Sequence, residues 1–400
     1  MLNILFVLYH DFRANSAIHV HNFANQLASL GNRVAVAVPK NKETSANLGQ
    51  QRYVPINFAE VTGDWSYLFK NGRPPDLVHA WTPREKVRSF CKHLRRRCSF
   101  QLFIHLEDNE EIILEANLQI PFAQAERMTE TEIPSWLSHP TLYKRFLAEA
   151  SGVTLIMDRL EAFVPSTMPR LLLWPGADAE LFHPGPKDET LLKQLGIPVN
   201  SIVLCYTGNV HALNAREVRS LYLAVAMLNR EGLPTTLVRA GRDYYPFLGA
   251  DEQWAKKYSV ELGYVKHVEI GRILSLADIL IQPGTDNAFN CYRLPSKLPE
   301  FFAMGRPVIL PHTNVGRFVR HGVHAWVLPK VDALGIFEAI KHFRSNEGLV
   351  EQLGAGALQF YKQHFNWETS ARKLQRFYTQ VLDAEKRPTE QSWRVESAYA

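Results

Sequence analysis

The sequence predicts an α/β protein built from two Rossmann-like domains. The chain has 400 residues, more than one hydrophobic core normally supports, so two domains of comparable size are expected. Short apolar runs alternate with segments of helical periodicity in the first half, and the alternation begins again after residue 200. Strands separated by helices favour parallel, doubly wound sheets, in which ligands collect at the carboxyl ends of the strands.

The first half supplies one such series. Apolar runs predict strands at 4–8, 33–39, 76–80, 101–106 and 152–157. Residues 18–30 carry apolar side chains at helical spacing, and Gly31 follows as a helix stop. The stretch 110–149 breaks the alternation, with Pro121 and Pro134 inside it, and we interpret it as an insertion of helices.

The second half supplies the other series. Strands are expected at 201–208, 235–241, near Val268 and at 278–283, with helices at 216–232 and 272–277. A last amphipathic helix is expected at 366–382, and the polar remainder, 383–400, is expected to be a flexible tail. The polar stretch 185–189 marks the boundary, so the domains are predicted at 1–183 and 190–365.

The composition is that of a soluble globular protein, with 46% hydrophobic and 21% charged residues. No apolar run is long enough to span a bilayer and the start lacks a basic leader, so a cytoplasmic protein is expected. The net charge of +5 does not argue for nucleic acid as a partner. The four cysteines form no CxxC pair and no zinc spacing, which predicts reduced thiols.

One segment is strongly basic. Residues 84–98 hold seven basic side chains against the single acid Glu85, with apolar residues at helical spacing. A basic amphipathic helix can contact an anionic lipid, which would bring the protein to the cytoplasmic membrane surface. The alternative is a solvated helix that packs on a sheet through its apolar stripe, and we favour this interpretation.

The most informative segment is 287–309. A polar turn at 292–296 precedes a helix that carries Lys297 and Glu300, and Gly305 ends this helix before an apolar strand. Unpaired amides at a helix start favour a bound phosphate, and Lys297 adds a full positive charge. Glu300 lies one turn further along, where it can accept hydrogen bonds from the hydroxyls of a sugar.

This segment resembles the donor-binding segment of the retaining glycosyltransferases of family 4, or glycosyl transferases group 1, which have the GT-B fold. The family pattern has two glutamates separated by seven residues, then a small residue, a glycine, a basic residue and Pro-Val. Glu300 takes the place of the second glutamate, and Tyr292 stands where the first is expected. The rest of the pattern is matched by Ala303, Gly305, Arg306, Pro307 and Val308.

The resemblance implies two Rossmann-like domains with a cleft between them. The domain at 1–183 would then face the acceptor, and the domain at 190–365 would bind the donor. The helix at 366–382 would cross back and pack on the first domain, and the insertion at 110–149 would form a wall against the acceptor. The donor would be a nucleotide diphosphate sugar, which is a substrate, so no cofactor is expected.

Donor binding requires positive charge at the departing diphosphate. Lys297 and the amides around it suit this demand, and the neighbouring candidates are Arg293, Leu294 and Ser296. The loop 208–216 lies where relatives carry a basic pair that clamps the diphosphate. In this loop Gly208 is followed by Asn209 in place of the usual arginine, and Arg216 falls slightly late for the usual lysine. All three residues are candidate donor contacts.

The predicted catalytic residues are His105, Glu107 and Tyr292. The segment after the strand at 101–106 resembles the one that bears the family's active-site histidine. His105 can therefore bond a hydroxyl of the donor sugar, while Glu107 orients it or meets the acceptor. Tyr292 enters the set because it replaces the family's first glutamate. The turn at 11–19 contains no glycine, and His19 within it can be no more than the exposed start of a helix.

No Asp-x-Asp pair follows a predicted strand, and lysine, arginine and helix amides can stabilise the leaving group, so no metal is expected. The resemblance therefore implies a retaining hexosyltransferase of glycan or glycoconjugate biosynthesis, and we expect it to be metal-independent. In a front-face mechanism the departing phosphate can take the acceptor's proton. The alternatives are a sugar-nucleotide epimerase of the same fold and a non-catalytic nucleotide-sugar-binding relative. The nucleotide base, the sugar and the acceptor stay open, and the acceptor can be a sugar, a lipid-linked sugar or a small molecule.

Overall fold

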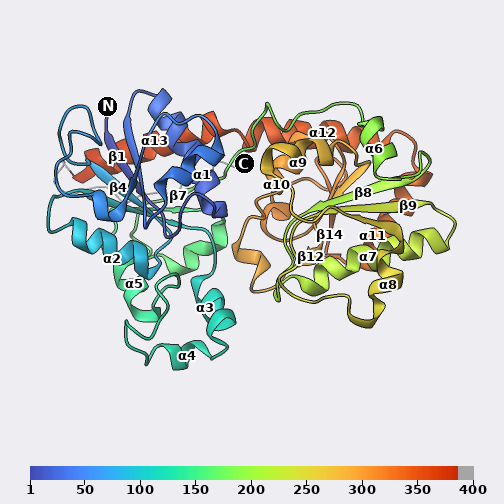
Figure 1. Ribbon diagram of the computed structural model, residues 1–400, viewed down its shortest axis with the longest axis horizontal. Coiled ribbons are helices and arrows are strands. Elements are labelled where there is room, and N and C mark those ends of the chain that lie inside the picture. The colour runs from blue at the N-terminus through green and yellow to red at the C-terminus, as the bar shows by residue number, and fades with distance from the viewer. Residues whose placement is uncertain (386–400) are drawn as a thin grey trace. The chain divides into compact units, whose positions relative to one another are not determined.

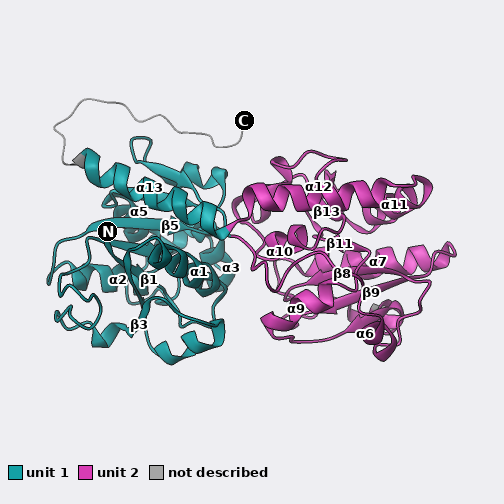
Figure 2. Cartoon of the chain, turned by 90° about the horizontal axis from the view of Figure 1, so that it is seen from above, with its two compact units in different colours: residues 1–175, 367–400 teal, residues 176–366 magenta. Residues whose placement is uncertain are grey.

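The computed structural model describes residues 1–385 and divides into two compact α/β units (Figure 1, Figure 2). Unit 1 comprises Met1–Pro175 together with the chain from Trp367 onward, and unit 2 comprises Gly176–Asn366. The division thus falls before the polar stretch at 185–189 that suggested a boundary. Of the predicted tail, residues 383–385 form the end of a helix, and residues 386–400 lie outside the described residues.

Unit 1 is built on a seven-stranded, all-parallel sheet with the order β3-β2-β1-β4-β5-β6-β7. Its strands are β1 Asn3–Val7, β2 Arg33–Val38, β3 Val54–Asn57, β4 Leu77–Trp81, β5 Gln101–Leu106, β6 Gly152–Leu155 and β7 Arg170–Leu172. Its α-helices are α1 Asn15–Ser29, α2 Glu85–Leu94, α3 Glu110–Leu118, α4 Phe122–Ala125, α5 Pro140–Ala148 and α13 Trp367–Glu385. Helices cover both faces of the sheet (Figure 1). The predicted doubly wound arrangement is confirmed.

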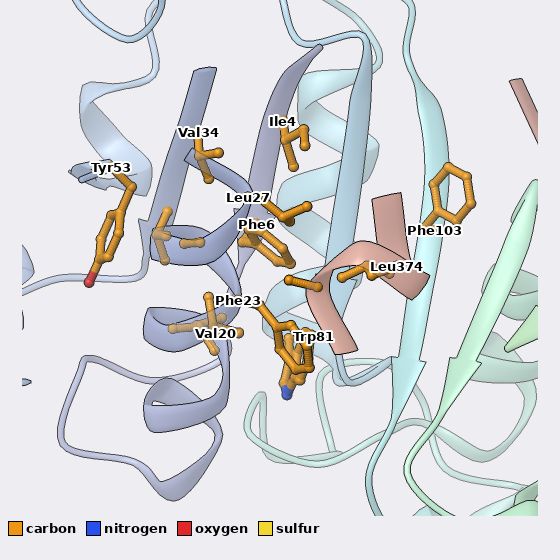
Figure 3. Close-up of a cluster of buried hydrophobic side chains, with 14 of the residues drawn as sticks. Ile4, Phe6, Val20, Phe23, Leu27, Val34, Tyr53, Trp81, Phe103 and Leu374 are labelled. Carbon is orange, nitrogen blue, oxygen red and sulfur yellow. The ribbon is translucent and has the colours of Figure 1, made fainter. Parts of the chain in front are cut away.

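The core of unit 1 forms because the central strands are apolar on both faces. β1 is buried along its whole length, and α1 turns Val20, Phe23 and Leu27 toward it at helical spacing. Figure 3 shows these side chains gathered with Phe6 and with Leu374 of α13. A helix from the far end of the chain therefore completes the core of the first unit, as the resemblance implied.

The insertion at 110–149 forms α3, α4 and α5. Asn109 caps α3 by accepting hydrogen bonds from the amides of Glu111 and Ile112. A small apolar cluster lies under these helices, formed by Leu114, Ala125, Ile133 and Leu137. Helices were therefore correctly predicted here, and the proposed contact with an acceptor stays a prediction.

Unit 2 repeats the plan with a six-stranded parallel sheet of order β10-β9-β8-β11-β13-β14 and a two-stranded antiparallel ribbon of β12 and β15. The strands are β8 Ile202–Thr207, β9 Thr235–Ala240, β10 Ser259–Glu261, β11 Ile279–Ile281, β12 Gly284–Thr285, β13 Val308–Pro311, β14 Trp326–Leu328 and β15 Lys330–Val331. The helices are α6 Glu189–Gln194, α7 Ala215–Arg230, α8 Glu252–Ala255, α9 His267–Leu274, α10 Leu298–Ala303, α11 Ala333–Ser345 and α12 Leu349–His364. Helices again lie on both faces (Figure 1).

One predicted strand of the second half is wrong. Val268 lies in α9, where it is 62% exposed, and the edge strand is β10, a few residues earlier. The apolar residues of this segment follow a helical period, with Ile273 and Leu274 buried on one face. A short β-branched run was therefore misread, because tertiary pairing rather than propensity decides an edge strand.

The basic segment forms α2, but two of its arginines are not on the surface. Arg84 pairs with Glu110 at 3.2 Å, and Arg88 pairs with Glu85 at 2.6 Å. Both arginines are buried. The exposed positive charge is left to Lys92, Arg95, Arg96 and Arg97 near the helix end, which favours a packed helix over a wholly cationic face. Within residues 1–385, no helix combines the length and apolarity needed to traverse a bilayer.

Candidate functional site

The carboxyl ends of β8 and β9 meet at two glycines. A Cβ on Gly241 would collide with the backbone carbonyl of Gly208, and φ at Gly241 is +142°. The amide of Gly208 donates to the carbonyl of Ala240 at 2.7 Å, which holds the two turns together. The absence of side chains at these glycines therefore lets the turns after β8 and β9 pack closely, and the side chains of Lys297 and Tyr206 fill the space beside Gly208.

Lys297 lies against this edge. Its Cε would be 2.9 Å from a Cβ on Gly208, and its Nζ is 4.8 Å from the ring centre of Tyr206. The ammonium donates to Oε1 of Gln282 at 3.3 Å. Burial, and next the charge of Arg293, lower the pKa of Lys297 to about 7. The structure therefore holds an incompletely solvated lysine at the carboxyl end of β8.

Arg293 is the second cation of this cluster. Its guanidinium stacks over Phe289 at 4.2 Å, and its Nε is buried without a hydrogen-bond partner among the described residues. His211 meets the same Phe289 ring edge-on, and burial together with Arg293 and Lys297 lowers the pKa of His211 to about 4. In the part of the chain that the structure describes, neither Lys297 nor Arg293 forms an ion pair with a carboxylate. Two cations held in this way favour a bound anion.

Glu300 is placed beside this cluster but is already engaged. Its Oε1 receives a hydrogen bond at 2.8 Å from Nε2 of His267, the first residue of α9. Burial lowers the pKa of His267, but the hydrogen bond and charge of Glu300 outweigh it, so the net shift is upward. A diol would therefore bind to a carboxylate whose orientation His267 has fixed. No local pattern marks His267 as the partner of Glu300, because 33 residues separate the pair.

Glu217 is a second carboxylate that the sequence analysis missed. It lies in the first turn of α7, and its Oε1 accepts from Nδ2 of the buried Asn290 at 2.6 Å. Burial raises the pKa of Glu217, while the hydrogen bond from Asn290 and the charges of Arg293 and Lys297 oppose the rise. A lone acid in a helix start carries no distinctive pattern. Asn290, its hydrogen-bond partner, lies 73 residues away in sequence. Only the fold brings Glu217 near this residue and the two cations.

The other residues of the predicted donor turn make no contact that assigns them a role. α10 begins at Leu298, so Lys297 is its N-cap, and the helix has only six residues. The positive charge of the site therefore comes mainly from side chains, since so short a helix adds little dipole. Leu294 is buried, Ser296 is exposed and Tyr292 is half-buried at the end of the 3₁₀ turn Asn290–Tyr292. Roles for these three stay predictions.

The predicted clamp in the loop 208–216 takes another form. Oδ1 of Asn209 accepts from the amide of Arg242 at 2.8 Å, so this side chain ties two loops together. Arg216 is exposed in the first turn of α7, and its side chain makes no hydrogen bond or ion pair within residues 1–385. The structure thus brings Lys297, rather than Arg216, to Gly208.

In unit 1, His105 lies too deep to meet a ligand. It is 1% exposed in β5, its Nδ1 bonds Oγ1 of Thr154 at 2.8 Å, and its ring stacks on Trp81 at 3.9 Å. Burial lowers the pKa of His105 to about 3, so the ring is neutral. The expectation that it touches a sugar hydroxyl is corrected: both faces of β5 are covered, so residues 102–106 are all buried.

Glu107 is the engaged acid at this end of the sheet, and it orients His19 rather than His105. Its Oε1 accepts from Nδ1 of His19 at 3.0 Å and from Nε1 of Trp81 at 2.7 Å, while Oε2 accepts from Ser16. Burial would raise the pKa of Glu107, but the hydrogen bond from His19, nearby positive charge and the Ser16 hydroxyl lower it to about 2. His19 is thus no exposed helix start, since only 9% of its side chain is exposed.

No grouping of three or more His, Cys, Asp or Glu side chains suited to a metal ion occurs within residues 1–385. The four cysteines are free thiols. Cys91 and Cys205 are buried, and burial raises the pKa of each thiol to about 12, so neither is a nucleophile.

The chain resembles known proteins in sequence and in fold. Residues 201–346 match the family model described as glycosyl transferases group 1. The chain is 26% identical over 226 residues to D-inositol 3-phosphate glycosyltransferase of Thermobispora bispora, a match that covers 52% of this chain and 50% of that protein. The chain thus spans about half the length of the curated relatives it matches.

Solved structures extend the likeness to both units. The chain resembles sucrose-phosphate synthase from Thermosynechococcus elongatus with a TM-score of 0.70 and 17% identity, covering 96% of this chain and all of that one. It resembles HepE of Anabaena in complex with UDP and glucose with a TM-score of 0.68 and 16% identity, covering 95% of this chain and 100% of that one. At these identities the likeness shows the fold, which is the predicted GT-B fold.

Proposed function

We propose that this chain, whose residues 201–346 match the family model of glycosyl transferases group 1, transfers a sugar from a nucleotide diphosphate sugar to an acceptor hydroxyl. The observation that carries the proposal is the pair of cations, Lys297 and Arg293, near the carboxyl end of β8. Phosphate is the ligand that best fits two uncompensated cations.

The diphosphate would bind against Gly208 with its negative charge facing Lys297 and Arg293. These cations stabilise the departing nucleotide diphosphate more than the bound donor, because charge develops on the leaving oxygen as the glycosidic bond breaks. Glu300, held by His267, would accept hydrogen bonds from a diol of the donor. Each contact supports either donor binding or departure of the leaving group.

The finer points of the proposal come from the resemblance. The pattern at 292–309 favours retention of configuration and a hexose donor, and the cation pair makes a metal ion unnecessary for the leaving group. The solved relative HepE binds UDP and glucose, which favours a uridine nucleotide as the first donor to try. The named curated relatives transfer to D-inositol 3-phosphate, which supports a small polar acceptor as one class to test. Glycan or glycoconjugate synthesis in the cytoplasm is the setting that this chemistry suits.

The deciding experiment is a binding and product screen. The full chain is incubated with a panel of nucleotide sugars that includes UDP-glucose, and bound donors are identified by native mass spectrometry. Acceptors that include D-inositol 3-phosphate are then added, and products are analysed for mass and anomeric configuration. We expect one donor to bind and its sugar to appear on an acceptor with retention. A chain that binds no nucleotide sugar would contradict the proposal.

The same screen separates the two alternatives. A sugar-nucleotide epimerase would convert the donor alone into an epimer, without an acceptor. A non-catalytic binding relative would hold the donor without transfer and without slow hydrolysis. The engaged pair Glu300 and His267 favours binding in all three cases, so product analysis rather than affinity decides among them.

A further inference from the structure

We propose that His267 is a positioning residue for the donor: it holds one oxygen of the Glu300 carboxylate so that the other oxygen binds a diol of the nucleotide sugar selectively. This inference rests on the proposed glycosyl transfer and deepens it. It adds that His267, without touching the donor, sets how strongly the site discriminates against a donor that lacks one hydroxyl of the diol.

The first support is the half-satisfied carboxylate of Glu300. Its Oε1 accepts a hydrogen bond from Nε2 of His267 at 2.8 Å, and within residues 1–385 its Oε2 has no partner. The side chain is 17% exposed, so the carboxylate is neither sealed in the core nor fully solvated. Both oxygens of Glu107 in unit 1, by contrast, are already occupied. A partly buried carboxylate oxygen without a partner favours a bound hydroxyl.

The second support is that the ring of His267 is committed to Glu300. His267 is the first residue of α9, and its Nδ1 has no hydrogen-bond partner in the part of the chain that the structure describes. An ionised carboxylate only accepts hydrogen bonds, so Nε2 of His267 is the donor to Glu300. A side chain whose hydrogen bond ends on one carboxylate is placed to orient that carboxylate, as a supporting residue does behind a binding contact.

The third support is the packing that holds the imidazole. The ring centres of Phe182 and His267 are 5.4 Å apart, with the rings tilted by 55°. Phe182 belongs to the segment 176–184, with which unit 2 begins. This segment packs directly on α9, since a Cβ on Gly271 would come within 1.9 Å of the carbonyl oxygen of Leu181. Phe182 is therefore fixed against α9, and it limits the positions that the imidazole can take.

The charged groups around the imidazole strengthen its bond to Glu300. Burial lowers the pKa of His267, but the hydrogen bond and charge of Glu300 and the charge of Asp178 outweigh it, so the net shift is upward. Lys266 and Glu269 are the charged residues next to it along the chain. A protonated imidazole donates a charge-assisted hydrogen bond, which is stronger than a neutral one. The acidic surroundings of His267 therefore favour the form that holds Glu300 most firmly.

The orientation of Glu300 matters because the phosphate contact lies close to it along the chain. Lys297 directly precedes α10 and Glu300 lies in the first turn of this helix, and the charges of the two residues interact. A carboxylate fixed relative to the cation accepts a hydroxyl at one position only, whereas a rotating carboxylate adapts to several donors. The hydrogen bond from His267 thus turns an acid near the phosphates into a selective contact.

The test compares donor binding to the full chain in wild type, His267→Leu and His267→Gln by calorimetry. The probes are UDP-glucose and two analogues, one with 2′-deoxyribose and one with 3-deoxyglucose, so that a ribose diol and a sugar diol are tested separately. We expect wild type to bind one analogue roughly 10- to 100-fold more weakly than UDP-glucose, since a hydrogen bond to a charged group is lost. In His267→Leu this ratio should shrink to about threefold or less. His267→Gln keeps an N–H donor and should keep the ratio.

Two further variants separate positioning from a general loss of structure. His183→Leu is the matched control, because His183 is an exposed histidine of unit 2 whose ring bonds the carbonyl of its neighbour, Pro184. It should leave the ratio unchanged. The double variant His267→Leu with Glu300→Ala should bind UDP-glucose within about twofold of Glu300→Ala alone, because His267 acts through Glu300. Additive losses in the double variant would overturn the inference.

Another measurement needs no ligand. Proton NMR titration of the histidine rings, with the His267 signal assigned through the His267→Gln spectrum, gives the pKa of His267. We expect this pKa to be lower in Glu300→Gln than in wild type, because the variant removes the carboxylate charge and keeps the side-chain shape. An unchanged pKa would show that the two side chains are not paired in solution and would overturn the inference.

The outcomes separate the two proposals. The same discrimination in His267→Leu as in wild type, or none in wild type, would overturn the positioning role and leave the glycosyl transfer standing. Absence of nucleotide-sugar binding in wild type would instead contradict the proposed function and remove the basis of the inference. Circular dichroism and thermal unfolding of each variant confirm that it is folded before its affinity is compared.

Discussion

The side chain of Lys297 crosses the backbone of Gly208, with Cε 2.9 Å from the position that a Cβ would take there. Lys297 immediately precedes α10, and Gly208 immediately follows β8, so two segments about ninety residues apart in sequence meet at the carboxyl end of β8. The proposed donor chemistry depends on this contact.

Removing the Lys297 charge should weaken donor use. Lys297→Ala deletes one cation from a site that has no carboxylate ion pair to compensate, so donor kcat/KM should fall by roughly ten- to a thousand-fold. Glu300→Ala should lower donor kcat/KM by a similar factor, since it removes the proposed contact with the diol. Steady-state kinetics with UDP-glucose measures both. Lys193→Ala, at an exposed position in α6, is the matched control, and wild-type kinetics in both site variants would refute the donor assignment.

Donor affinity should depend on pH through Lys297. Burial lowers the pKa of this lysine to about 7, so the free protein holds the charged form below that pH and the neutral form above it. A diphosphate binds the charged form, so affinity for UDP-glucose should be highest below pH 7 and fall by up to roughly tenfold per unit above it. Calorimetric titration from pH 6 to about 9 measures this. In Lys297→Met the affinity should be low and nearly independent of pH, and a profile like that of wild type would point to another group.

Gly241 should not tolerate a side chain. Gly241→Ala places a Cβ against the carbonyl of Gly208 at a φ of +142°, which should destabilise unit 2 by about 2–4 kcal/mol. Donor affinity should fall with it, because the Gly208 turn must move. Gly232→Ala separates the cost of the positive φ from the cost of the collision, since Gly232 also has a positive φ but open space around it. That variant should cost only about 1–2 kcal/mol, as judged by thermal unfolding. Equal losses in the two variants would show that the contact with Gly208 has no effect.

Glu217 should act by holding the loop that contains Asn290 and Arg293. Glu217→Ala leaves the buried amide of Asn290 without its carboxylate partner, so the loop that carries Arg293 should loosen and donor KM should rise roughly tenfold. Glu231→Ala, at the end of the same helix and paired only at 3.9 Å, is the control. An unchanged KM in Glu217→Ala, with the fold intact, would assign the residue to unit stability alone.

Chelation should leave transfer intact. Lys297 and Arg293 supply the charge that a metal would otherwise bring to the diphosphate, so millimolar EDTA should change the initial rate by less than about twofold. The measurement uses UDP-glucose with and without added Mg²⁺ after dialysis. Loss of activity that Mg²⁺ restores would show that the cation pair is not sufficient.

The sequence by itself determined the architecture. Alternating apolar runs and helical periodicity gave both parallel sheets, because burial on two faces leaves a local pattern in each strand. The segment at 292–309 also indicated the GT-B fold and named Lys297 and Glu300 as candidate donor contacts, because a short motif keeps its spacing along the chain. The prediction near Val268 failed where the local pattern was weak.

Tertiary structure alone decided which charged groups meet. Glu217 reaches Asn290, His267 reaches Glu300 and His19 reaches Glu107 over separations of 33 to 88 residues, with only the fold to bring them together. The depth of a side chain was equally hidden, because a strand-end position such as His105 can face the core or the ligand. Local sequence encodes burial periodicity, whereas pairing and solvation depend on elements that are distant in the chain.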